Sequence, residues 1–134
     1  MVTFLYRAAG QPVVTNTVNP FTDVTAADWF YNAVLWAVQE KITTGTSETT
    51  FSPYDTVTRG QTVTFLWRYA KSPVVVASNP FTDVPANEYY TNAVLWAVQE
   101  KITNGMTATT FEPNTPCTRG QIVTFLYRDL GQSK

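Results

Sequence analysis

The stretch TRGQTVTFLWR at residues 58–68 returns as TRGQIVTFLYR at residues 118–128, so the chain contains an internal repeat. Its second half occurs a third time at the start of the chain, as VTFLYR at residues 2–7. The first and fourth residues of the stretch, Thr58 and Gln61, have the spacing of a capping box, in which the two side chains bond backbone N–H groups of the first turn. The stretch therefore predicts a capped helix with an arginine at its first position.

The position of the arginine at the helix start indicates a binding site for an anion. Arg59 and its counterpart Arg119 stand beside the free N–H groups of the first turn and the positive end of the helix dipole, where anions bind. Gly60 and Gly120 follow them and have no Cβ, so a ligand could approach the backbone closely. The sequence therefore predicts an anion site at each of two helix starts.

The overall composition excludes several classes of protein. The chain has 134 residues and a net charge of −1, which argues against a basic nucleic-acid-binding face and against a polybasic membrane patch. No stretch approaches the roughly 20 apolar residues of a transmembrane helix, so no membrane insertion is expected. Histidine is absent and the single cysteine, Cys117, has Val57 as its counterpart. We therefore expect a buried apolar cysteine and neither a metal site nor a cofactor.

Internal repetition organises the chain. Residues 19–72 and 79–132 are about 60% identical when they are aligned without gaps. Residues 1–12 match the final helix of such a repeat, so Met1 stands at a cut within a preceding copy, and an export signal is expected to lie outside this chain. One helix pair has too little core to be stable alone, and we therefore expect the copies to pack together as one compact module.

Each repeat is predicted to contain a helix, a long ordered loop and a second helix, which makes the fold class all-α. The first helix follows the motif Asn-Pro-Phe-Thr-Asp-Val. In the first repeat Thr25 is expected to cap it, with Asp28 at the third helical position, and in the second repeat Pro85 or Ala86 is expected to begin it. Its apolar residues recur with the spacing of a helix that buries one face, with Trp36 at the margin of that face. Gly45 and Gly105 are expected to end this helical region with positive φ.

Five motifs in this order and spacing resemble the S-layer homology repeat, and they cover residues 19–132 almost without gaps. In the first repeat they are Phe-Thr-Asp-Val at 21–24, Trp29, Ile42 to Gly45, Thr-Phe-Ser-Pro at 50–53 and Thr-Arg-Gly-Gln at 58–61. The second repeat has the same elements, with Tyr89 in place of Trp29.

The resemblance implies both a fold and a function. Repeats of this family usually occur in threes in exported bacterial proteins and form a pseudo-threefold helical domain. Grooves between the repeats hold the protein non-covalently to cell-wall glycan, commonly a pyruvylated secondary polymer. Carried over by position, the glycan-binding residues are Arg59, Arg119, Asp23, Asp83, Trp29, Tyr89, Gly45 and Gly105, to which the helix-start argument adds Gly60 and Gly120.

The sequence departs from the family pattern in three ways. Gly-Gln replaces the Ala-Glu of the arginine motif, so the capping box survives while a carboxylate is lost. Trp29 becomes Tyr89, so the two sites need not be equivalent. The third repeat is represented only by its last helix, so only one groove between repeats would be close to whole.

Each candidate residue also has a purely structural interpretation. The arginines could be solvated or bonded to Asp23 or Asp83, and these aspartates could instead bond backbone amides at the helix start. Trp29 and Tyr89 could pack in the core. If the arginines bind ligand from the surface, substituting them should weaken binding and change stability by no more than about 1 kcal/mol.

We interpret the chain as a non-enzymatic module that anchors its parent protein to the bacterial cell surface by binding an acidic cell-wall polysaccharide. A glycosidase would need two carboxylates flanking the scissile bond, and nothing in the sequence pairs the acids. The alternative is an assembly module without an intact glycan site. In that case the exposed half-repeat would exchange with a complementary helix of another chain and form a homodimer.

Overall fold

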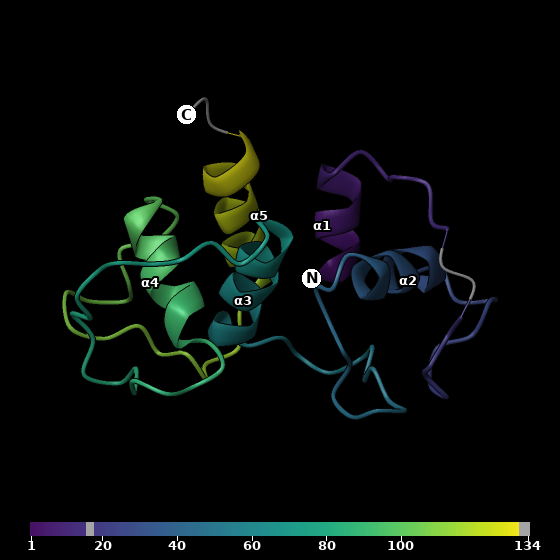
Figure 1. Ribbon diagram of the computed structural model, residues 1–134, viewed down its shortest axis with the longest axis horizontal. Helices are drawn as coiled ribbons and strands as arrows, with labels where there is room; N and C mark the ends of the chain where they lie inside the picture. The colour runs from purple at the N-terminus through teal and green to yellow at the C-terminus, as the bar shows by residue number, and fades with distance from the viewer. Residues whose placement is uncertain (16–17, 132–134) are drawn as a thin grey trace. The chain divides into compact units, whose positions relative to one another are not determined.

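The structure is a computed structural model that describes residues 1–15 and 18–131 (Figure 1). Within these residues the regular structure is helical, apart from one isolated antiparallel bridge between Thr58 and Pro116, so the predicted all-α class is confirmed. None of the described helices is long and apolar enough to cross a membrane. The elements are α1 (Val2–Ala8), α2 (Tyr31–Gln39), α3 (Arg59–Tyr69), α4 (Thr91–Gln99), α5 (Arg119–Leu126) and the π-helix η1 (Tyr127–Gly131).

The chain divides into two compact units, Met1–Asp55 and Thr56–Lys134. In the first unit α1 packs against α2, and in the second α3 packs against α4 and contacts α5. Each unit thus joins the last helix of one repeat to the first helix and loop of the next. The repeat bounds 19–72 and 79–132, their union in one module and their pseudo-threefold arrangement remain predictions.

The core of the first unit lies between α1 and α2. Leu5 and Val34 are fully buried, and Trp36 is only 2% exposed. The Trp36 ring lies 5.4 Å from the ring of Tyr6, centroid to centroid. The sequence pattern places Trp36 at the margin of the apolar face, but its ring lies inside the core. Helix α2 is buried on more than one side, because every residue from Ala33 to Ala37 is buried.

The core of the second unit is built from α3, α4 and the loop that follows α4. Val63 and Leu66 of α3 are fully buried, as are Val94 of α4 and Phe111 of the loop. A fully buried Phe side chain stabilises a fold by about 2 kcal/mol through the apolar surface it removes from water. The loop between α4 and α5, residues 100–118, which we call the second loop, is therefore an integral part of the core. Cys117 is buried as well, as the sequence predicts.

The first helix of each repeat begins later than the capping pattern indicates. Helix α2 starts at Tyr31, six residues after Thr25, and α4 starts at Thr91. In the first repeat the Asp28 carboxylate accepts a hydrogen bond of 2.8 Å from the Thr25 N–H, which closes a turn rather than a helical start. In the second repeat the Thr91 hydroxyl donates to the Pro85 carbonyl over 2.6 Å and holds the equivalent turn. The predicted starts at Thr25 and Pro85 are wrong for this reason.

The same helices end before the glycines that the sequence assigns to their ends. Helix α2 ends at Gln39, and Lys41 adopts the positive φ of 61° that closes it. Gly45 and Gly105 have positive φ, at 90° and 91°, as predicted, but both lie in the loops beyond the helices. These loops, and not the helix ends, therefore require glycine.

Replacing Gly45 with alanine tests this requirement. A Cβ at Gly45 would lie 2.5 Å from Phe21 Cε1 and 2.5 Å from the Thr50 carbonyl oxygen, so the loop would have to shift. We expect Gly45→Ala to lower the free energy of unfolding by more than about 2 kcal/mol. Gly10→Ala is the matched control, since Gly10 also has positive φ, at 88°, but nothing lies within 4 Å of the place that its new methyl group would occupy. Equal losses in urea denaturation would contradict the steric argument.

Candidate functional site

Both capped helices start where the sequence predicts. The Thr58 hydroxyl accepts a hydrogen bond of 3.1 Å from the Gln61 N–H, and the Gln61 side chain accepts one of 2.9 Å from the Thr58 N–H. Thr118 and Gln121 make the same pair at 3.1 and 3.0 Å. The two capping boxes are therefore confirmed, and they place an arginine and then a glycine at the first two positions of α3 and α5.

The first turn of α3 is closed by the second loop rather than open to a ligand. The Arg59 N–H donates to the Thr115 carbonyl over 2.9 Å, and the Gly60 N–H donates to the Pro113 carbonyl over 2.8 Å. A Cβ on Gly60 would lie 3.0 Å from that same Pro113 oxygen. The idea that these N–H groups bind an anion is therefore wrong for α3, and Gly60 serves the close approach of the loop backbone.

Arg59 is buried, with 3% of its side chain exposed. Its Nε donates to the Phe111 carbonyl over 2.8 Å, and its guanidinium carbon lies 4.7 Å from the Phe111 ring and 5.5 Å from the Phe125 ring. Burial lowers the pKa of Arg59, although an arginine remains charged at neutral pH. Arg59 is thus neither solvated nor hydrogen-bonded to an aspartate, but stacked between two aromatic rings.

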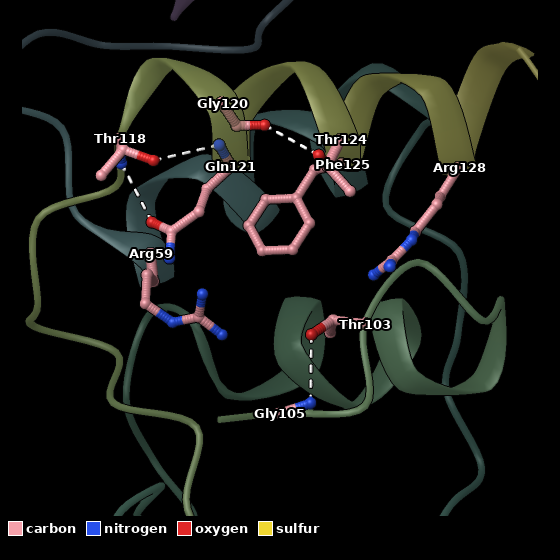
Figure 2. Close-up of a pocket in the computed structure, with 9 residues that line it drawn as sticks. All are labelled: Arg59, Thr103, Gly105, Thr118, Gly120, Gln121, Thr124, Phe125 and Arg128. Atoms are coloured by element: carbon pink, nitrogen blue, oxygen red, sulfur yellow. Dashed lines mark hydrogen bonds between the residues drawn. The ribbon is translucent and has the colours of Figure 1, made fainter. Parts of the chain in front are cut away.

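A pocket of about 450 Å³ opens beside this arginine within the second unit. Arg59 from α3 and Arg128 from η1 lie on opposite sides of the Phe125 ring, which α5 supplies, and the loop after α4 forms the facing wall (Figure 2). The charged groups that line it are both cationic. The lining residues are Arg59, Thr103, Gly105, Thr118, Gly120, Gln121, Thr124, Phe125 and Arg128.

Arg128 is the member of this pocket that the sequence analysis does not single out. Its Nη1 donates to the Ile102 carbonyl over 3.2 Å, which ties η1 to the loop after α4. A signal for it exists in the sequence, because the helix motif ends in arginine in all three copies, at Arg7, Arg68 and Arg128. The capping box involves only the first four residues of the motif, so it does not identify the arginine at its end.

The structure brings only part of the predicted site together. Arg59, Gly105 and Gly120 line the pocket, whereas Arg119 is exposed and is not among the lining residues. Gly60, Asp83 and Tyr89 belong to the same unit but do not line the pocket. The remaining predicted residues, Asp23, Trp29 and Gly45, belong to the first unit.

Asp23 and Asp83 hold their loops by hydrogen bonds to backbone amides. The Asp23 carboxylate accepts bonds of 2.9 Å from the Phe51 N–H and 2.8 Å from the Ser52 N–H. Asp83 makes the same two bonds, also 2.9 and 2.8 Å long, to amides 28 and 29 residues further along the chain. The aspartates therefore bond amides of the loop rather than those of the helix start.

Trp29 and Tyr89 lie at the surface and not in the core. Trp29 is 73% exposed and Tyr89 is 51% exposed. Each ring packs edge to face on its neighbour, Phe30 or Tyr90, at centroid distances of 5.4 and 5.0 Å. The Arg7 guanidinium carbon also lies 5.9 Å from the Trp29 ring. Exposed, well-supported rings of this kind are suited to stacking on a ligand.

These features define an all-α repeat protein with a cationic pocket beside a capped helix. Residues 20–63 and 80–123 each match the family model described as the S-layer homology domain. The two matches cover more than half of the 134 residues, so the chain belongs to the S-layer homology family, as the motifs indicate. Repeats of this family generally anchor proteins to the cell wall and occur in proteins of the cell surface.

The chain is also similar to part of a much longer protein. It is 33% identical over 109 residues to an endoglucanase of Bacillus sp. (strain KSM-635). The match covers 81% of this chain and 11% of the endoglucanase, so the chain corresponds to a small segment of that enzyme.

The burial of Arg59 changes the expected effect of removing it. Arg59→Ala would leave the Phe111 carbonyl without its donor and would remove a stacked side chain, so we expect a loss of about 2 kcal/mol in the free energy of unfolding. Arg119→Ala, at the equivalent but exposed position, should change it by less than about 0.5 kcal/mol. Urea denaturation measures both. Similar small losses for the two variants would show that the Arg59 contacts contribute little.

The loop contact of Asp23 predicts a pH dependence. Burial tends to raise the pKa of Asp23, but the hydrogen bonds from the Phe51 and Ser52 amides outweigh it and lower the pKa below its ordinary value of 3.8. Because the folded state favours the ionised carboxylate, the contribution of these hydrogen bonds to the free energy of unfolding is complete above the pKa that Asp23 has in the unfolded chain. It is lost as the pH falls through the lower pKa that Asp23 has in the folded chain.

We therefore expect Asp23→Asn to cost about 1 kcal/mol near neutral pH, a modest value because solvent screens this half-exposed carboxylate. The difference from the wild type should shrink steadily as the pH is lowered from about 5 to about 2. Thermal unfolding across this range measures it. A difference that stays constant with pH would mean that the charge of Asp23 is not what holds the loop.

Proposed function

We propose that this chain binds an acidic cell-wall polysaccharide, a pyruvylated secondary polymer, and thereby anchors its parent protein non-covalently to the bacterial envelope. The observation that carries the proposal is the pocket in which Arg59 and Arg128 flank the ring of Phe125. Two cations with no carboxylate among the lining residues favour an anionic ligand.

The arginines are suited to a carboxylate such as that of a pyruvyl ketal. The Nε of Arg59 is occupied by the Phe111 carbonyl, while its two terminal nitrogens have no hydrogen bond within the described residues. Two parallel N–H groups of a guanidinium match the two oxygens of a carboxylate. Because Arg59 is stacked between Phe111 and Phe125, its guanidinium loses little further freedom when a ligand binds.

The remaining lining residues are suited to a sugar. The Thr103 hydroxyl accepts a hydrogen bond of 3.1 Å from the Gly105 N–H, so its own proton can be donated to a ligand oxygen. The pocket volume of about 450 Å³ lies within the usual range of small-molecule sites, about 300–1,000 Å³. We therefore propose that the pocket takes one acidic sugar of the polymer, with Gly105 allowing the close approach of the loop.

The other predicted residues receive secondary roles in this proposal. Asp23 and Asp83 support the loops, as does Gly45. The exposed rings of Trp29 and Tyr89 provide stacking surfaces for neighbouring sugars of the same polymer. The proposal includes no catalysis, since hydrolysis of a glycoside needs two carboxylates at the scissile bond and the pocket is lined by none.

Retention on purified cell wall tests the proposal. We expect the wild-type chain to bind wall that carries the pyruvylated polymer, and Arg128→Gln to weaken this binding at least about tenfold, which corresponds to a lost charged hydrogen bond. The matched control is Lys101→Gln, which removes the same charge from an exposed residue of the same unit outside the pocket. It should bind like the wild type.

Two outcomes would contradict the proposal. Equal retention of the wild type on wall from which the polymer has been removed would exclude the glycan as ligand. Equal weakening by Arg128→Gln and Lys101→Gln would mean that only net charge matters and that the pocket is not the site.

A further inference from the structure

Gln121 lines the pocket as well as capping α5. Its side-chain oxygen accepts the hydrogen bond of 3.0 Å from the Thr118 N–H. Because a backbone N–H can only donate, the atom that faces it must be the amide oxygen, and the other atom is the amide nitrogen. The capping box thus fixes the orientation of the Gln121 amide group.

The amide nitrogen of Gln121 is directed into the pocket. Figure 2 shows it on the side of the amide group that faces Arg59. The oxygen and the backbone N–H of Gln121 make the two contacts of the capping box, whereas the amide nitrogen has no acceptor within the residues that the structure describes. A neutral N–H donor therefore faces the cavity.

Arg59 presents charged donors to the same cavity. Its side chain is 3% exposed and its Nε is held by the Phe111 carbonyl, while its terminal nitrogens have no hydrogen bond in the described part of the chain. A buried charge without a full set of partners costs free energy, so these nitrogens favour an anionic acceptor.

The pocket itself supplies no such acceptor at this end. The Thr118 hydroxyl accepts a hydrogen bond of 3.1 Å from the Gln121 N–H, and the Thr124 hydroxyl donates to the Gly120 carbonyl over 2.8 Å. The lining residues include no carboxylate. An acceptor shared by Arg59 and Gln121 must therefore come from a ligand.

We infer that Gln121 is a specificity-determining residue of the pocket. Its amide N–H donates to one oxygen of the ligand carboxylate, and the other oxygen accepts from the Arg59 guanidinium. The inference rests on the proposed function, in which the pocket takes an acidic sugar.

The identity of residue 121 supports this role. Glutamate, which the family pattern has at this position, would complete the capping box equally well, because its carboxylate can accept from the Thr118 N–H. It would also present a negative charge to the cavity, where glutamine presents a donor. Capping alone therefore does not require glutamine, whereas binding of a carboxylate beside Arg59 favours it.

NMR titration of the whole chain tests the inference with two probes. One is the methyl glycoside of a hexose that carries a pyruvyl ketal, and the other is the neutral methyl ester of the same compound. The amides of Gly105 and Gly120, which both line the pocket, report binding. We expect the wild type to bind the charged probe at least about tenfold more tightly than the ester.

Gln121→Glu tests the role of the amide. Its carboxylate still caps the helix and favours the positive end of the helix dipole, so thermal unfolding should be unchanged or slightly higher. Affinity for the charged probe should fall at least about tenfold, because a donor becomes a negative charge beside the ligand carboxylate. Affinity for the ester should fall by no more than about threefold, as for a lost neutral hydrogen bond.

The matched control is Gln99→Glu. It makes the same change from an amide to a carboxylate at an exposed residue of α4, in the same unit and outside the pocket. This variant should bind both probes like the wild type.

Two results would overturn the inference and leave the proposed function intact. In the first, Gln121→Glu binds the charged probe as tightly as Gln99→Glu does. In the second, Gln121→Glu weakens both probes by the same factor, so residue 121 does not distinguish the carboxylate from the ester. A wild type that does not favour the charged probe, or an Arg128→Gln variant that binds it normally, would instead overturn the proposed function and this inference with it.

Discussion

Two hydrogen bonds connect the second loop to the first turn of α3, from the N–H groups of Arg59 and Gly60 to the carbonyls of Thr115 and Pro113. The free N–H groups of a helix start must find partners when they are buried, and a loop whose carbonyls face them is one solution. Glycine at the second helical position makes this possible, since a Cβ there would lie 3.0 Å from the Pro113 oxygen. This contact joins the end of one repeat to the loop of the next.

The same contact determines how the site is built. Once the loop covers the first turn, the Arg59 side chain is confined between Phe111 and Phe125, with its Nε held by a carbonyl. Its terminal nitrogens then face a pocket that Arg128 completes. The arginine of the capping motif thus serves the fold and the proposed ligand together. By contrast, the first two residues of the same motif in α5, Arg119 and Gly120, are exposed, and Arg119 lies outside the pocket.

Local features of the fold could be predicted from the sequence, and features that depend on distant residues could not. The Thr-x-x-Gln spacing identifies both capping boxes, because the interacting groups are three residues apart. The burial of Arg59 depends on Phe111, which lies 52 residues further along the chain, and no local pattern shows this contact. The late start of α2 depends on an Asp28 side chain that closes a turn instead of capping a helix. Arg128 enters the site only because η1 brings it beside the loop after α4.

Amide hydrogen exchange, followed by NMR on the dilute chain, tests most directly whether the loop closes one helix start and leaves the other open. The Gly60 and Gly120 amides occupy the same position in two helices with the same capping box. We expect the Gly60 N–H to be strongly protected, because it donates to the Pro113 carbonyl, and the Gly120 N–H to exchange near the rate of an unstructured peptide. Equal exchange at the two glycines would contradict it.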